Sequence, residues 1–193
     1  MKPSDALLQA MQAAEKAVLA GEPLWQIYGD RAGSPPVAPW PKEPCKVVFL
    51  DFDGVLNSEQ SVERFGTRYR FAKENVTALN EILRLTDARL VITSSWREGL
   101  TLREMIGFLE RDGVLPVQLA GKTKSLEKER GLEIDGWLRS VPYPVSSFAI
   151  LDDRDDMAMH HERLVQVNSQ TGLSMAQAQL AIKLLAKPWK GNV

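Results

Sequence analysis

The sequence has little of three features that would place a protein in a class at once. It holds a single cysteine, Cys45, among 193 residues, which excludes an internal disulfide and fits a reducing compartment. Its formal net charge is −1, so bulk electrostatics favours no partner, although a local basic patch can still exist. No apolar run approaches the ~18 residues of a membrane span, and acids and glutamines interrupt the N-terminus where a signal peptide would need an apolar core. We therefore expect a soluble, cytoplasmic protein that does not associate with membranes.

The first 44 residues differ in composition from the rest. Residues 4–20 carry an apolar stripe at helical spacing, with Ser4 to begin a helix and Gly21 to end it. Such a helix packs on its own domain or serves as a contact for a homodimer or another partner. Residues 33–44 are rich in proline, which predicts an extended linker; a ligand for a proline-binding domain is the alternative. We therefore expect an N-terminal helix and linker over 1–44 and a folded catalytic domain over 45–193.

From Cys45 onward, apolar runs alternate with amphipathic segments. The strand-like runs cover residues 46–50, 88–95, 114–120, 147–153 and 163–168. The helical segments cover residues 72–86, 101–111, 125–139 and 174–186. This alternation predicts a three-layer α/β/α, Rossmann-like domain with a mostly parallel sheet. Ligands of such sheets bind outside the carboxyl ends of the strands.

Polar side chains gather where three of these strands end. They are Asp51 and Asp53 after the first strand, Thr93 and Ser94 after the second, and Asp152 and Asp153 after the fourth. Each group alone is equally well a turn former or a helix cap. In a parallel sheet, however, all three ends share one edge, and carboxylates crowded there repel one another unless a cation joins them. Carboxylate ligands beside hydroxyls favour Mg²⁺.

The same residues resemble the motifs of the haloacid dehalogenase (HAD) superfamily of phosphotransferases. Residues 51–56, DFDGVL, are similar to its first motif, residues 91–94, VITS, to its second, and residues 151–156, LDDRDD, to its fourth. The third motif is one basic residue, usually Lys. Arg130 is the preferred candidate because RGLEIDGWL resembles the small capless branch of the superfamily. The other candidates are Lys128, Lys124 and Lys122.

The resemblance implies roles for these side chains. Asp51 is the nucleophile that becomes an aspartyl phosphate, and Asp53 protonates the leaving oxygen and then deprotonates water. Thr93 holds a phosphate oxygen, together with nearby backbone N–H groups. Arg130 neutralises the phosphoryl group and the nucleophile.

The resemblance also implies a metal site and substrate contacts. The residues assigned to Mg²⁺ are Asp51, Asp53 through its backbone carbonyl, Asp152 and Asp153. Among them Asp153 is expected to be a direct ligand, while Asp152 and Asp156 act from outside the direct ligands or through water. The residues expected to contact substrate are Gly54, Ser94, and Trp96 and Arg97 at the rim of the site. Arg97 either binds a second phosphate or pairs with one of the acids.

The spacing of the motifs bears on the substrate. The stretches from Asp53 to Thr93 and from Thr93 to Arg130 are too short to hold a folded cap, which indicates an open site suited to large substrates. Residues 62–73 interleave basic and aromatic side chains, as nucleic-acid contacts do, although a flap with packed aromatics gives the same pattern. RNA- and DNA-repair phosphatase domains of the superfamily are similar, so we expect a phosphatase for nucleic-acid ends or another bulky phosphorylated substrate.

Three alternatives compete with this interpretation. A small-molecule phosphatase, for nucleotides or sugar phosphates, would use the same residues. A catalytically silent binding module could keep the fold alone. A phosphoacceptor receiver domain also places acids at strand ends around Mg²⁺, but its acidic pair follows the first strand, whereas here the DxD pattern comes first and the acidic pair last.

Overall fold

The computed structural model describes residues 43–115, 119–126, 129–141 and 143–191. The helix expected over 4–20, its partner contacts and nearly all of the proline-rich segment lie outside these residues. Among the helices described, none combines the length and the apolar character that a membrane crossing requires.

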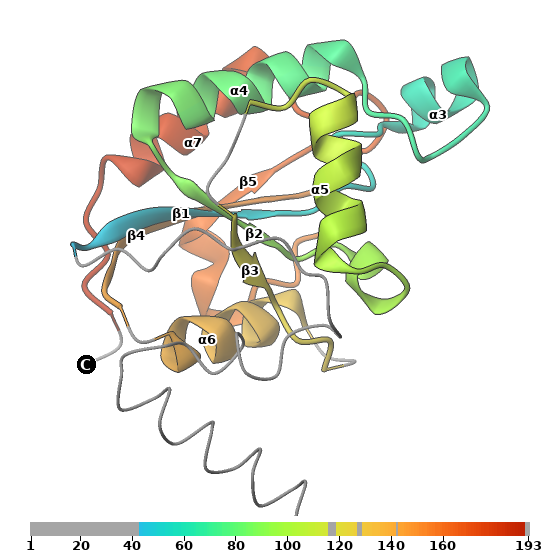
Figure 1. The fold of residues 1–193 in the computed structure, drawn as a ribbon. Helices are drawn as coiled ribbons and strands as arrows, with labels where there is room; N and C mark the ends of the chain where they lie inside the picture. Colours follow the sequence, from blue (N-terminus) through green and yellow to red (C-terminus); the bar gives the residue numbers. More distant parts are fainter. Residues whose placement is uncertain (1–42, 116–118, 127–128, 142, 192–193) are drawn as a thin grey trace, which may run out of the picture.

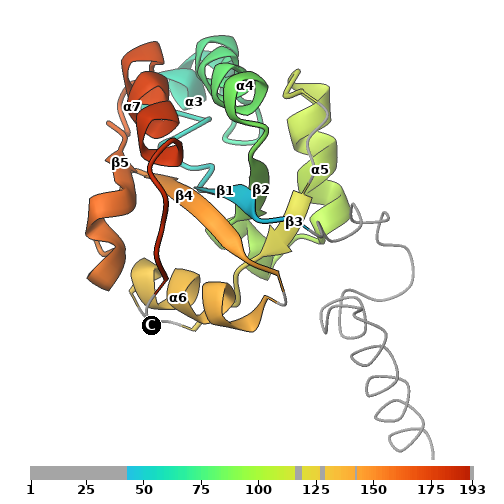
Figure 2. The ribbon, with the colours of Figure 1, turned by 90° about the vertical axis from the view of Figure 1, so that its left-hand side faces the viewer.

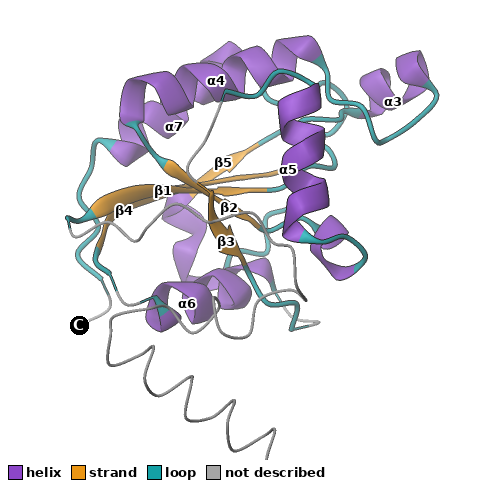
Figure 3. Cartoon of the chain, in the orientation of Figure 1, coloured by secondary structure: helices purple, strands orange, loops and turns teal. Residues whose placement is uncertain are grey.

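A five-stranded sheet forms the centre of the domain (Figures 1 and 3). Its strands are β1 (Cys45–Leu50), β2 (Arg89–Ile92), β3 (Leu119–Lys122), β4 (Val145–Asp152) and β5 (Leu164–Gln166). All neighbouring strands pair in parallel, in the order β3-β2-β1-β4-β5. The α/β class and the parallel sheet predicted from the sequence are confirmed. Because β1 lies in the middle, its carboxyl end is flanked by those of β2 and β4.

Helices cover both faces of the sheet, so the domain has three layers (Figure 2). One face carries α4 (Lys73–Thr86), α5 (Leu102–Arg111) and α7 (Met175–Leu185). The other carries α6 (Arg130–Ser140), beside the short 3-10 helix η2 (Ala158–Arg163). Two further short elements are α3 (Glu59–Phe65) and the 3-10 helix η1 (Ser95–Glu98), which directly follows the end of β2.

The buried side chains of β1 alternate between these two layers. Val48 and Leu50 belong to the apolar core beneath α4, α5 and α7, whereas Val47 and Phe49 belong to the core beneath α6. Side chains of a strand point to opposite faces with a period of two, so a fully apolar run fits a strand that is covered on both sides. The same alternation directs the next odd-numbered residue, Asp51, toward the α6 side.

Two predicted elements differ most from the structure in their bounds. The strand expected over 114–120 is β3 (Leu119–Lys122), in which Leu119 pairs with Leu90. Residues 114 and 115 are not part of it, and 116–118 lie outside the described residues. This edge strand continues past the apolar run into a glycine and a lysine, which an edge strand tolerates. The end of the apolar run therefore did not mark the end of the strand. The helix expected over 125–139 begins only at Arg130, because contacts with the loop after β4, described below, fix its first turn.

Helix α3 was not predicted, although its signals are present. Ser58 caps its first turn by accepting the Ser61 N–H, and Gly66 ends it with a φ of +68°, which glycine adopts readily. Its seven residues are too few to show a clear helical period. A capping box of Thr101 and Glu104 begins α5, which forms where the sequence predicts a helix.

Candidate active site

The register of the sheet brings two of the predicted acids side by side. Leu50 of β1 pairs with Leu151 of β4, and the Asp51 N–H donates to the Leu151 carbonyl at 3.0 Å. Asp51 and Asp152, the next residues on the two strands, therefore leave the sheet together. Both are buried, with 5% and 0% of their surface exposed. Two acids that are distant in the sequence thus become one pair of buried carboxylates.

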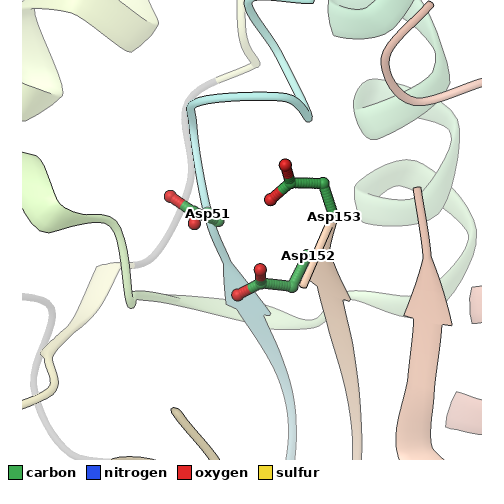
Figure 4. A group of neighbouring side chains, drawn as sticks. All are labelled: Asp51, Asp152 and Asp153. Atoms are coloured by element: carbon green, nitrogen blue, oxygen red, sulfur yellow. The ribbon is translucent and has the colours of Figure 1, made fainter. Parts of the chain in front are cut away.

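Asp153 completes a group of three acids at this edge (Figure 4). One carboxylate oxygen from each of Asp51, Asp152 and Asp153 lies within 4.8 Å of the other two. Loss of solvent, followed by the charge of Asp51, raises the pKa of Asp152 to about 7, and the same two causes raise the pKa of Asp153. The Asp152 Oδ2 atom is buried and accepts no hydrogen bond. An all-oxygen group of this kind fits one hard divalent cation, which would relieve the crowding.

The guanidinium of Arg130 places a positive charge of the protein next to the acidic group. Its Nη2 lies 3.0 Å from Asp51 Oδ2, its Nε lies 3.5 Å from Asp152 Oδ2, and its Nη1 donates to the Thr93 carbonyl. One guanidinium thus contacts residues at the ends of β1, β2 and β4.

The other basic candidates for the third motif differ from Arg130 in position. The Lys122 ammonium lies 3.4 Å from the Arg97 carbonyl, and Lys124 is exposed. Lys128 lies outside the described residues. Arg130 itself is in direct contact with Asp51.

The loop after β4 holds the start of α6 and thereby places Arg130. Asp156 accepts the Arg130 N–H on its carboxylate at 3.1 Å and the Gly131 N–H on its carbonyl at 3.0 Å. Gly131 packs so closely that a Cβ would lie 2.0 Å from the Met157 carbonyl oxygen. Asp156 was expected to act from outside the direct metal ligands or through water, and this stays a prediction. It lies outside the three grouped acids, and its carboxylate also accepts from Arg154 Nε at 2.9 Å.

Asp53 lies apart from the three grouped acids and is partly exposed to solvent. Its Oδ1 accepts from Asn57 Nδ2 at 2.8 Å, and its Oδ2 accepts from the indole N–H of Trp96 at 3.0 Å. Its side chain is 37% exposed, and Arg68 Nη1 lies 3.9 Å away. The carboxylate is therefore fixed by two donors yet accessible to solvent. The metal contact through its backbone carbonyl stays a prediction.

Both the backbone conformation at position 54 and the closeness of Asp153 require a glycine there. Its φ of +73° is unfavourable for other residues, and a Cβ would lie 2.6 Å from Asp153 Oδ2. The glycine thus lets the loop after β1 pass directly against the third acid. The sequence predicted a substrate contact for Gly54, but not this close approach to Asp153.

The residues after β2 are more deeply buried than expected. Thr93 and Ser94 have no exposed surface; the Thr93 hydroxyl has no hydrogen-bond partner, and the Ser94 hydroxyl accepts the Trp96 N–H at 3.4 Å. Trp96 and Arg97 were placed at the rim, which is wrong: they are only 7% and 8% exposed. The Arg97 guanidinium instead binds Glu133 of α6 at 2.5 Å and donates to the Thr93 carbonyl. The substrate contacts expected of Gly54 and Ser94 stay predictions.

Two residues that support the site, Asn57 and Glu133, were not predicted from the sequence. Asn57 closes the DFDGVLN stretch, and its amide donates to both Asp53 and the Arg68 carbonyl, the latter at 2.7 Å. Glu133 lies one helical turn after Arg130 and neutralises Arg97. The one signal for Glu133 was its position three residues after Arg130, which places the two on the same side of a helix. Asn57 had no signal apart from its place in the motif.

The parallel sheet, the acids after β1 and β4, and Arg130 at the start of α6 are the arrangement expected of a HAD-like domain, and comparison with known families agrees. A family model described as the HAD domain in Swiss Army Knife RNA repair proteins matches residues 47–178, about two thirds of the sequence, and the chain belongs to this family. The resemblance to nucleic-acid repair domains is thereby confirmed. No curated protein matches the chain.

Proposed function

We propose that the protein is a Mg²⁺-dependent phosphomonoesterase that acts through an aspartyl phosphate on Asp51. The observation that carries the proposal is that Asp51 and Asp53, with one residue between them in the sequence, have different environments. Asp51 is buried between Arg130 and two further acids, whereas Asp53 is partly exposed and accepts hydrogen bonds from Trp96 and Asn57. Membership of a HAD family supports hydrolase chemistry at this position.

The two carboxylates would divide the reaction between them. A carboxylate oxygen of Asp51 attacks phosphorus as the ester P–O bond breaks, and Asp53 gives a proton to the departing oxygen. Asp53 then takes a proton from a water molecule, which attacks the aspartyl phosphate and releases inorganic phosphate. Arg130 holds Asp51 in place and offsets the negative charge near phosphorus. Mg²⁺ bound by Asp51, Asp152 and Asp153 would supply further positive charge at the phosphoryl group.

The test is hydrolysis of p-nitrophenyl phosphate by the native protein and by Asp51→Asn. Native turnover should require Mg²⁺ and stop with EDTA, and the variant should lose at least about a thousandfold in kcat because an amide is a poor nucleophile. Circular dichroism and the melting temperature check that the variant is folded. Full activity of folded Asp51→Asn would contradict the assignment of the nucleophile.

The substrate class that we favour is a phosphorylated nucleic-acid end. The family is described from RNA repair proteins, and Arg68 of the basic and aromatic segment 62–73 lies 3.9 Å from the partly exposed Asp53 carboxylate. A panel of 3′- and 5′-phosphorylated oligonucleotides, nucleotides, sugar phosphates and phosphopeptides tests this choice. A preference for nucleotides or sugar phosphates would instead favour a small-molecule phosphatase. No turnover of any phosphoester would favour a binding module.

A further inference from the structure

A basic cleft lies outside the acidic group, between α3, α4 and α5. Its volume is about 810 Å³, and its walls include Arg64, Phe65, Arg70, Lys73 and Arg111. Figure 1 shows α3 projecting from the domain at the upper right, near the ends of α4 and α5. The roles derived above for Asp51, Asp53 and Arg130 make no use of this cleft.

The charge of the basic cleft is positive although the chain carries a net charge of −1. Two carboxylates face its four cations: Glu74 lies 3.1 Å from Arg64, and Asp112 contacts both Arg70 and Arg111. The three arginine side chains remain 42–54% exposed. Because a guanidinium has five N–H donors and these contacts use only some of them, each arginine can still bind a phosphate.

Aromatic rings accompany these charges. Phe65 is 37% exposed, with the guanidinium groups of Arg64 and Arg70 at 4.5 and 5.6 Å from its ring centre. Tyr69 is 50% exposed, and its ring stacks on Phe108 at 5.8 Å and contacts Trp96 at 5.1 Å. Exposed rings among arginines suit unpaired bases, which stack on aromatic faces, whereas a duplex keeps its base faces covered.

Three consecutive residues connect the active site with the basic cleft. Arg68 lies 3.9 Å from the Asp53 carboxylate, and Asn57 bonds both the Arg68 carbonyl and Asp53. Tyr69 follows with its half-exposed ring, and Arg70 already lines the cleft. A chain that leaves the phosphoryl site past Asp53 therefore meets a cation, an aromatic face and then the cleft.

We propose that the basic cleft binds the single-stranded polynucleotide whose terminal phosphate enters the active site. Tyr69 stacks on a base near the end, while Arg64, Arg70, Lys73 and Arg111 contact phosphates of the backbone. The choice of a polynucleotide follows from repeated cations alternating with aromatic faces, since a phosphopeptide offers neither a phosphate at every residue nor a flat ring at regular intervals. This inference rests on the proposed function for the terminal phosphate only.

The double variant Arg64→Gln/Lys73→Gln tests the cleft, with Arg84→Gln/Lys183→Gln as its matched control. Arg84 is exposed and paired with Glu81, much as Arg64 is with Glu74, and Lys183 is exposed on α7. Binding of a fluorescein-labelled, unphosphorylated 12-mer, as RNA and as DNA, is measured by anisotropy from low to moderate salt. Each phosphate contact in a single strand contributes about −0.7 to the slope of log K against log[salt], so the cleft variant should lose about 1.4 of this slope. An unchanged slope for both RNA and DNA would overturn the proposal.

A kinetic measurement separates this inference from the proposed function. The ratio of kcat/KM for a terminally phosphorylated 12-mer to that for p-nitrophenyl phosphate should fall roughly tenfold in the cleft variant and stay constant in the control. Because the anisotropy probe carries no terminal phosphate, cleft binding is measured even if no phosphoester is hydrolysed. If the cleft variant hydrolyses p-nitrophenyl phosphate with an unaltered ratio of kcat/KM values and unaltered oligonucleotide binding, the phosphatase proposal is supported and the proposed role of the cleft is contradicted.

Discussion

At the scale of single residues, environment separates two aspartates that the sequence presents as a pair. Asp51 is buried against Arg130 and two other acids, whereas Asp53 is partly exposed to solvent and accepts hydrogen bonds from Trp96 and Asn57. Carboxylates in such different surroundings can serve as nucleophile and as acid–base group on the same substrate. The DxD spacing predicted a shared site for the two, but the donors that orient Asp53 come from residues that only folding brings near.

Replacement of Trp96 by Phe tests the orientation of Asp53. The phenyl ring keeps most of the packing against Phe52 and Phe71 but removes the N–H that binds the carboxylate. A hydrogen bond to a charged group contributes about 1.5–3 kcal/mol, so kcat for p-nitrophenyl phosphate should fall roughly tenfold to a hundredfold with little change in KM.

Trp137→Phe, on the opposite side of the sheet, is the control for this change. Trp137 packs edge-on against Phe49 and does not contact Asp53, so its variant should keep the native kcat at temperatures below its melting point. Equal values of kcat for Trp96→Phe and the native protein would show that the indole N–H does not position Asp53.

At the scale of elements, the start of α6 decides where the positive charge of the site lies. Arg130 and Gly131 form its first turn, which is held by Asp156 and pressed against Met157. The amphipathic pattern predicted the helix but placed its start several residues too early. Helix propensity could not locate this boundary, because the contact that fixes it joins α6 to a loop far along the chain.

Gly131→Ala should therefore displace the helix, while Gly136→Ala in the same helix should not. A Cβ at Gly131 would lie 2.0 Å from a backbone carbonyl oxygen, whereas a Cβ at Gly136 meets nothing within 4 Å. We expect Gly131→Ala to lower the free energy of unfolding by about 1–3 kcal/mol and kcat by about tenfold or more, because Arg130 moves with the helix. Gly136→Ala should raise the free energy of unfolding by up to about 1 kcal/mol and leave kcat unchanged. Urea unfolding and turnover of p-nitrophenyl phosphate measure both, and equal behaviour of the two variants would contradict this account.

At the scale of the whole molecule, the acidic group links folding to pH. Without a metal, burial and the charge of Asp51 raise the pKa of Asp152 to about 7, above the ordinary value of 3.8. The folded state then binds more protons than the unfolded state between these values. Stability from this group is therefore highest at low pH and falls as the pH rises toward 7.

The Asp152→Asn variant lacks the ionisable group that causes this pH dependence of the free energy of unfolding. Comparison of the variant with the native protein in EDTA therefore measures the contribution of Asp152. The gain in the free energy of unfolding over the native protein should be larger at pH 8 than at pH 5.5, by about 2 kcal/mol, because only the native protein must ionise a buried acid. The exposed Asp87→Asn is the control, since asparagine tolerates the positive φ of 51° found there. Added Mg²⁺ should stabilise the native protein most at pH 8. A gain that is equal at both pH values would contradict a raised pKa for Asp152.

The sequence by itself determined the α/β class, the parallel sheet and the family, because apolar runs that alternate with amphipathic segments, and acids at the ends of those runs, are local patterns. It also indicated Asp51 and Asp152, since two parallel strands that end in acids must place them at one edge. Only the tertiary structure decided that Trp96 and Arg97 turn inward and that Asp156 holds a helix start. The same holds for the basic cleft formed by α3, α4 and α5. These features depend on contacts between segments distant in the chain, which no local pattern records.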